Sequence, residues 1–141
     1  MNLYADSSAI LAWLFGEPEG EIIRSILAEA EVVLASDLTI VECERTIHRA
    51  QATGRVTEAQ TADRRHQLLA AAAHWGLLRL DDEVIERARR PFPAEPVRTL
   101  DALHLASALV ARAALPGLAL LSLDERMRAG GRGLGLALLP S

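Results

Sequence analysis

Four carboxylates stand at the edges of apolar segments, where an ionised side chain is normally excluded; they belong to Asp6, Glu42, Asp101 and Asp124. An ionised carboxylate on a core-facing edge must be paired with a partner, protonated or bound to a cation. If the fold brings the four together, their mutual repulsion favours a bound cation, and hard oxygen ligands suit Mg²⁺ or Mn²⁺. The elements that position these acids therefore decide which chemistry is available.

The composition is that of a soluble globular protein with one domain. Of the 141 residues, 50% are hydrophobic and 24% are charged, which is enough for one apolar core. No apolar stretch reaches the roughly 18 uninterrupted residues that span a bilayer, and Asp6 interrupts the first apolar run, so we expect neither a membrane span nor export. The lone Cys43 cannot form an internal disulfide, which fits a reducing cytoplasm.

The charged residues exclude some classes of function. A net charge of −4 argues against a nucleic-acid binder that is held mainly by a basic surface. All 15 basic residues are arginines, so chemistry that needs a lysine ammonium, such as a Schiff base or a P-loop, is excluded. Guanidinium groups suit phosphate contact, although a bias in genome composition would explain the arginines equally well.

Short apolar runs alternate with longer amphipathic stretches, a pattern typical of an α/β fold. We expect strands at residues 2–5, 32–35, 77–80, 118–122 and 134–138. We expect helices at residues 8–15, 18–30, 38–53, 58–75, 83–90, 100–113 and 125–129. Short strands separated by helices imply a parallel sheet with helices on both faces. The glycine-rich stretch 130–135 is expected to begin as a flexible segment.

The expected topology gathers the four acids at one end of the sheet. Ligands of an open parallel sheet bind beyond the carboxyl ends of its strands, where the strand order reverses. Asp6 ends the first strand and Asp124 follows the fourth, and a doubly wound order of 3-2-1-4-5 places those strands side by side. Asp101 lies in the first turn of a helix, where the helix dipole favours an anion. Glu42 lies early in the helix after the second strand.

Simpler roles are open to these acids when each is taken alone. Asp6 and Asp124 each precede an expected helix and could serve only as N-caps. Glu42 could be a solvated helix residue. We expect plain caps without chemistry at three further positions: Asp37, Asp81 and Asp82.

Four stretches together resemble a PIN-domain ribonuclease, and above all the VapC toxins of bacterial and archaeal toxin–antitoxin pairs. They are Asp-Ser-Ser-Ala at 6–9, the helical Glu42, Arg-Thr-Leu-Asp-Ala-Leu-His-Leu-Ala at 98–106 and Ser-Leu-Asp-Glu-Arg at 122–126. The resemblance covers the whole chain in order and spacing, and implies a single PIN domain over residues 1–141. The stretch around Asp101 is its most specific part.

The resemblance implies a three-layer α/β sandwich and an Mg²⁺- or Mn²⁺-dependent endoribonuclease that cuts a structured RNA such as a tRNA or rRNA loop. It implies a cytoplasmic homodimer held by a VapB-type antitoxin, whose C-terminal segment covers the active site. Two bound ions could activate a water and stabilise the leaving 3′ oxygen. Asp6 and Asp101 would be the primary ligands and catalytic residues, with Glu42 and Asp124 completing the cluster.

Several other polar residues could support such a site. His104 could hold the carboxylate of Asp101, three residues earlier, or could be an ordinary helix histidine. Ser7 or Ser122 could orient a ligand, although a cap or turn contact explains each serine as well. Some arginines could grip RNA phosphates or meet acidic groups of the antitoxin; these are Arg45, Arg49 and Arg126. The other histidines show no zinc-binding spacing.

Residues 11–15 and 22–27 carry more apolar side chains than one sheet face requires. Part of this strip could form a groove for an antitoxin helix, although it could equally be core. Competing functions remain open: cleavage of DNA by the same chemistry, a PIN nuclease outside a toxin–antitoxin pair, or a PIN-like module that only binds RNA or a partner. A phosphotransferase is disfavoured because Ser8 stands where its second aspartate is needed and lysine is absent.

Overall fold

The computed structural model describes residues 1–141 and contains one parallel sheet of five strands. The strand order is β3-β2-β1-β4-β5, which confirms the predicted 3-2-1-4-5 order. The strands are β1 (Asn2–Ala5), β2 (Val32–Ser36), β3 (Gly76–Leu78), β4 (Ala119–Leu121) and β5 (Ala137–Leu139). The central strand β1 pairs in parallel with β2 on one side and with β4 on the other, so the strand order reverses between β1 and β4.

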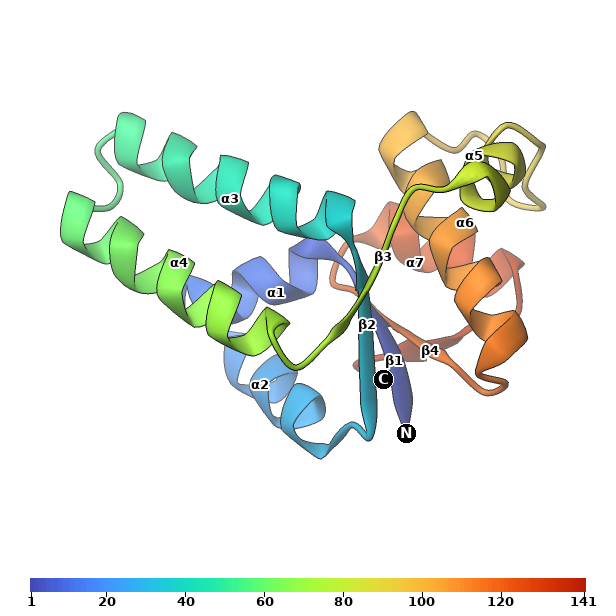
Figure 1. Ribbon diagram of the computed structural model, residues 1–141, viewed down its shortest axis with the longest axis horizontal. Helices are drawn as coiled ribbons and strands as arrows, with labels where there is room; N and C mark the ends of the chain where they lie inside the picture. The colour runs from blue at the N-terminus through green and yellow to red at the C-terminus, as the bar shows by residue number, and fades with distance from the viewer.

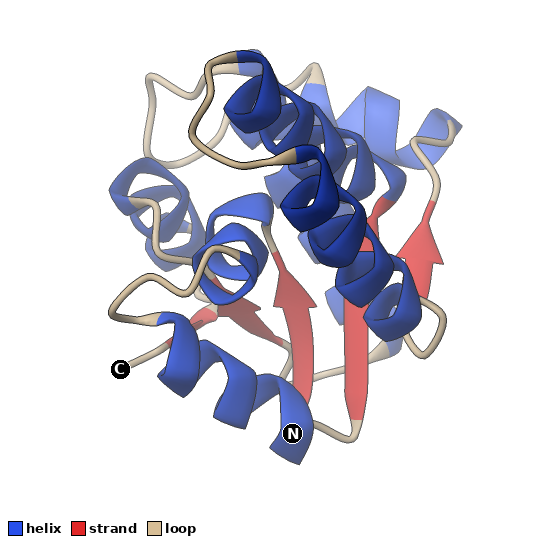
Figure 2. Ribbon diagram, turned by 90° about the vertical axis from the view of Figure 1, so that its left-hand side faces the viewer, coloured by secondary structure: helices blue, strands red, loops and turns tan.

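Helices cover both faces of the sheet and make three layers (Figures 1 and 2). One layer contains α1 (Ser7–Leu14), α2 (Gly20–Glu29), α3 (Asp37–Ala52) and α4 (Glu58–Ala72). The other layer contains α5 (Asp82–Ala88), α6 (Thr99–Ala114) and α7 (Glu125–Gly133). The α/β sandwich expected from the sequence is therefore confirmed. No helix combines the length and the apolar character that crossing a membrane requires.

The two faces of β1 belong to two separate apolar cores. Leu3 and Ala5 pack with α1 to α4, whereas Tyr4 packs with α6 and α7. Successive side chains of a strand point to opposite faces, so a strand buried on both faces must be apolar throughout. This explains why β1 is a continuous apolar run that stops at Asp6.

The C-terminal stretch differs most from the sequence-based prediction. Helix α7 continues through Gly133 instead of ending at residue 129, and β5 begins only at Ala137. Close packing explains the glycines: an added Cβ at Gly130 would lie 2.5 Å from Leu105 Cδ1, and one at Gly131 would lie 2.7 Å from Leu120 Cδ2. The prediction of a flexible start to this segment was wrong, because these glycines let α7 approach α6 and the sheet.

The apolar strip on α1 and α2 belongs in part to the core. Leu14 and Ile23 are buried in the core beside β1, and most other members of the strip pack against it. Only Ile22 is well exposed, at 51%. Docking of an antitoxin helix on the partly buried remainder of the strip stays a prediction.

Of the three aspartates predicted to be helix caps, one is a cap and two are not. Asp81 caps α5 by accepting a hydrogen bond from Val84 N at 3.0 Å, as expected. The cap of α3 is Ser36 and not Asp37, because Ser36 has the extended backbone of a cap and its Oγ accepts from Leu38 N. Asp37 and Asp82 instead lie in the first turns of their helices, where their charge meets the helix dipole favourably.

Candidate active site at the carboxyl edge of the sheet

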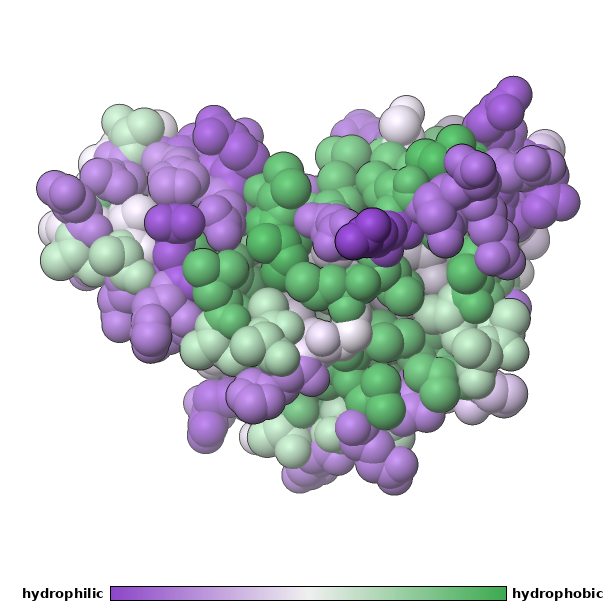
Figure 3. All heavy atoms as spheres, in the orientation of Figure 1, coloured by the Kyte–Doolittle hydropathy of each residue, from purple (hydrophilic) through white to green (hydrophobic).

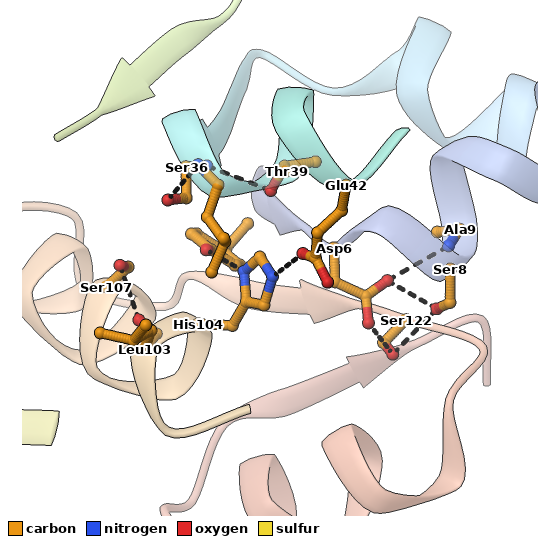
Figure 4. Close-up of polar contacts among 12 residues, drawn as sticks. Asp6, Ser8, Ala9, Ser36, Thr39, Glu42, Leu103, His104, Ser107 and Ser122 are labelled. Carbon is orange, nitrogen blue, oxygen red and sulfur yellow. Dashed lines mark hydrogen bonds and ion pairs between the residues drawn. The ribbon is translucent and has the colours of Figure 1, made fainter. Parts of the chain in front are cut away.

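Asp6 is buried at the point where β1 ends and α1 begins, with 2% of its surface exposed. Its Oδ1 accepts hydrogen bonds from Ala9 N at 3.1 Å and from Ser8 Oγ at 2.6 Å (Figure 4). Its Oδ2 accepts from Ser122 Oγ at 2.5 Å, from the segment that follows β4. Asp6 is thus an N-cap, but two serines also fix its carboxylate in one orientation.

The electrostatic state of Asp6 is set mainly by its burial. Burial raises the pKa of the Asp6 carboxyl, while the hydrogen bonds from Ser122, Ser8 and Ala9 N oppose that rise in pKa. A carboxylate in this position is more stable when a positive charge stands beside it. The site therefore favours a cation near Asp6.

Glu42, Asp101 and Asp124 line one pocket of about 310 Å³ at the N-terminal ends of α3, α6 and α7; we call it the acid pocket. Asp6 lies behind its wall and is connected to it through Ser122, whose Oγ also accepts from Asp124 N at 3.1 Å. Figure 4 shows Asp6 and Glu42 pointing into the same region from the end of β1 and from α3. The structure thus brings all four acids to one edge of the sheet.

The acids in the pocket influence one another. Burial is the largest cause that raises the pKa of the half-exposed Asp101, and the neighbouring charges of Asp124 and Glu42 raise it further. His104 and Arg126 act in the opposite direction on this pKa. Mutual repulsion among carboxylates is the condition that a bound divalent cation relieves.

His104 contacts Glu42 and not Asp101, so the predicted pairing was wrong. The imidazole is buried, with its Nε2 2.5 Å from Glu42 Oε1 and its Nδ1 2.7 Å from the hydroxyl of Tyr4. A buried imidazole needs a partner for each ring nitrogen. Tyr4 of β1 and Glu42 of α3 are these two partners. Because Tyr4 holds the imidazole from one side, His104 fixes the position of the Glu42 side chain on the other.

The serine that supports Asp6 from the same helix is Ser8 and not Ser7. Ser8 Oγ donates to Asp6 and accepts from Leu123 N at 2.9 Å, so it ties the start of α1 to the segment after β4. Ser122 has the orienting contact that the sequence suggested. The sequence held no signal for the contacts Ser8–Leu123 and Tyr4–His104, because these partners lie 115 and 100 residues apart in the chain.

A second hollow of about 380 Å³ adjoins the acid pocket along α3 and shares Glu42 and Leu100 with it. Arg45 and Arg49 line this hollow together with the exposed Val41. We call it the α3 groove. Its lining therefore places apolar side chains and two arginines beside Glu42 of the acid pocket.

The donor set suits a hard divalent cation in type, since it consists of carboxylate oxygens. In the present side-chain arrangement no three of the His, Cys, Asp and Glu residues are grouped closely enough to hold one ion. The contacts above explain this: serines hold Asp6, His104 holds Glu42, and Asp124 accepts from Arg126 N and Met127 N as the cap of α7.

The structure is an α/β protein with a parallel sheet and a cluster of acids at its topological switch point. The PIN domain family model matches residues 3–132, and the chain belongs to this family. Ribonuclease VapC46 of Mycobacterium tuberculosis is 35% identical over 137 residues, which cover 97% of this chain and 95% of that protein.

Solved structures share the fold at lower sequence identity. The M. tuberculosis toxin VapC20, described as cleaving the sarcin–ricin loop, superimposes with a TM-score of 0.64 at 15% identity, covering 92% of this chain and 95% of that one. A toxin–antitoxin complex from Klebsiella pneumoniae superimposes with a TM-score of 0.63 at 18% identity, covering 94% of each chain.

Proposed function

We propose that this chain is a metal-dependent endoribonuclease, the toxin of a VapBC-type pair, which hydrolyses phosphodiester bonds in structured cytoplasmic RNA such as tRNA or rRNA. The observation that carries the proposal is the acid pocket, where Glu42, Asp101 and Asp124 stand together with the buried Asp6 behind them. The family membership and the ribonuclease relative support the same activity.

The four acids would hold Mg²⁺ or Mn²⁺, with Asp6 and Asp101 as the primary ligands and Glu42 and Asp124 completing the set. When bound, a divalent cation supplies positive charge for the attacking water and for the leaving 3′ oxygen. Ser8 and Ser122 keep Asp6 in one orientation, so little rearrangement of that ligand is needed.

The chain's own residues also account for proton transfer and positioning. The water that attacks phosphorus must lose a proton, and a carboxylate in the acid pocket can accept it. His104 and Tyr4 hold Glu42 from behind, which limits the directions in which its carboxylate can turn. The result is an in-line displacement in which the protein contributes orientation and negative charge.

A cleavage assay tests the activity most simply. We expect the purified chain to cut single-stranded RNA in Mg²⁺, and we expect EDTA to stop the reaction. Asp6→Asn should stop it as well, because the variant keeps the helix cap but loses the charge. Cleavage that survives EDTA or Asp6→Asn would contradict a metal mechanism, and cleavage of DNA at an equal rate would contradict a ribonuclease.

An antitoxin partner is the second part of the proposal. The α3 groove offers exposed Val41 and Leu100 beside Arg45 and Arg49, and it opens into the acid pocket. An antitoxin segment lying in this groove would cover the acids. The protein encoded next to this chain's gene should bind it in size-exclusion chromatography, and Val41→Glu should weaken that complex without changing cleavage by the free chain.

The third part is a homodimer formed at the free edge of the sheet. Strand β3 pairs only with β2, and Figure 3 shows apolar side chains gathered on the face where β3 lies in front. Leu69, Leu77 and Ile85 are exposed on α4, β3 and α5. An exposed apolar patch at an open edge favours association. Light scattering should give a dimer mass for the native chain and a monomer mass for Leu77→Lys.

A further inference from the structure

A third hollow, of about 440 Å³, lies directly beside the acid pocket; we call it the side pocket. Residues 94–98 form one wall, and Ala129 and Gly130 of α7 form another. Three residues line both pockets: Arg98, Asp101 and Arg126. The two hollows are therefore adjacent, with two arginines and one acid at their junction.

The guanidinium groups of both junction arginines are uncommitted. Neither Arg98 nor Arg126 makes a side-chain hydrogen bond or an ion pair, although three acids line the acid pocket with them. Arg128 of the same helix behaves differently, since its guanidinium donates to three backbone carbonyls and so has a structural role. Free guanidinium donors at a cleft are available to a ligand.

The wall of the side pocket is fixed in place by its own acid. Both carboxylate oxygens of Glu95 accept backbone N–H groups, from Phe92 at 2.8 Å and from Val97 at 2.8 Å. Glu95 therefore holds the loop and forms no ion pair with Arg98. On the opposite side, Gly130 packs closely against Leu105 of α6, so the α7 wall of the pocket rests on α6.

A substrate that crosses the acid pocket must carry anionic groups on both sides of the reacting one. Carboxylates repel such a chain, so cations beside them are needed to hold it, and the planar guanidinium can bind a phosphate through two parallel hydrogen bonds. The side pocket has no aromatic side chain on which a base could stack. Its chemistry is thus suited to the sugar–phosphate backbone and not to a particular base.

We propose that the side pocket is the subsite for the nucleotide next to the scissile bond of a single-stranded RNA, and that Arg98 and Arg126 bind the flanking phosphates. This inference rests on the proposed ribonuclease function and adds the path of the strand: from the acid pocket, past the two arginines, into the space between residues 94–98 and α7. Recognition there is by backbone charge, so it is independent of base sequence.

Binding of a short fluorescent single-stranded RNA, measured by anisotropy in EDTA, tests the subsite without any cleavage. Arg98→Gln and Arg126→Gln should each raise Kd about tenfold at low salt, as expected for loss of a charge-assisted contact. The slope of log Kd against log salt should fall by about 0.7 for each variant. The Kd of Arg126→Lys should lie between those of the native chain and Arg126→Gln, because lysine keeps the positive charge but loses the two parallel N–H donors of the guanidinium.

Arg55→Gln is the matched control. Arg55 is exposed in the turn between α3 and α4, at the far end of that hairpin from α6 and α7 (Figure 1). We expect its Kd and salt slope to equal those of the native chain. If Arg98→Gln and Arg126→Gln bind RNA as Arg55→Gln does, the subsite proposal is overturned, and the two arginines become a surface for an acidic protein partner.

The cleavage assay separates this inference from the proposed function. In Mg²⁺ the two arginine variants should show a higher KM with kcat much less affected, because they bind backbone on either side of the reacting bond. A native chain that cuts RNA while the variants bind it normally would reject the subsite alone. A native chain that cuts no RNA would reject the ribonuclease function, whatever the binding data show.

Discussion

Two aspartates hold the same local position in this protein and differ in almost everything else. Asp6 follows β1 and caps α1 through Ala9 N at 3.1 Å, and Asp81 follows β3 and caps α5 through Val84 N at 3.0 Å. Asp81 is exposed and its side chain makes only that hydrogen bond. Asp6 is buried, and two serines bind the same carboxylate.

The difference comes from the place of each strand in the sheet. β3 is an edge strand, so water covers the cap that follows it, whereas β1 is central and its end lies beside β4 at the switch point. Capping alone does not require a buried carboxylate, because serine or asparagine caps a helix as well. A carboxylate that burial disfavours, at a position where a neutral cap would serve, is what the proposed metal-binding role of Asp6 requires, and the exposed Asp81 shows no such feature.

The largest expected contrast is in catalysis. Asp6→Asn should lower RNA cleavage about a thousandfold or more, as loss of a residue that acts with its neighbours as one unit commonly does. Asp81→Asn, which makes the same change at the exposed cap, should leave the cleavage rate within about twofold of native. Cleavage rates in Mg²⁺ measure both. Equal losses in the two variants would remove the distinction between these aspartates.

The next contrast concerns side chains that hold a carboxylate in one orientation, as His104 holds Glu42; Asp81 has no such partner. His104→Ala should weaken Mn²⁺ binding and cleavage about ten- to a hundredfold, because Glu42 loses the partner that orients it. His104→Gln keeps a donor towards Glu42 and should recover part of both. Manganese titration of each variant is the measurement. If Gln and Ala behave alike, His104 supports the fold and does not position Glu42.

The third contrast is in how the free energy of unfolding depends on pH. Burial raises the pKa of Asp6 in the folded chain above its ordinary value of 3.8, which applies to the unfolded chain. At a pH between these two pKa values, the folded chain holds a proton on Asp6 and the unfolded chain does not. Stability of the metal-free chain therefore falls as pH rises through that window, and the loss persists above the folded-state pKa. Asp6→Asn lacks this loss, so it should be more stable than native at neutral pH.

Urea unfolding in EDTA across acid and neutral pH measures this effect. The advantage of Asp6→Asn over the native chain should shrink as the pH falls, and added Mn²⁺ should stabilise the native chain but not the variant. A variant that is less stable than native at neutral pH would mean that the Asp6 charge contributes to folding.

The smallest effect is expected at the exposed cap itself. Asp81→Ala removes the acceptor for Val84 N and should lower the free energy of unfolding by about 1 kcal/mol. Cleavage should be unchanged. Urea unfolding combined with the RNA assay checks both, and a loss of activity here would extend the functional region to the end of β3.

The sequence was informative where a residue's role depends on topology. The apolar runs and their spacing predicted a parallel α/β sheet, and a doubly wound order of 3-2-1-4-5 for that sheet, which the structure confirms, places Asp6 beside the end of β4. Asp101 and Glu42 follow from it, because the helices that carry them begin at the same edge. The metal-binding role of the four acids stays a prediction.

The sequence was uninformative where a role depends on a distant partner. The sequence offered Asp101, its neighbour on α6, as one partner for His104, but the imidazole contacts Tyr4 and Glu42 on other elements. Gly130 and Gly131 were read as flexible for their intrinsic freedom, whereas close packing against α6 and the sheet places them inside α7. In each case tertiary packing overrides the local preference.

The central claim is that divalent cations relieve the repulsion among the four acids. A crystal grown with Mn²⁺ tests it most directly, through the anomalous difference map. We expect density between the carboxylates of Asp6 and Asp101, with Glu42 or Asp124 turned towards it. A map without density there at saturating Mn²⁺, with Glu42 still on His104, would contradict the account.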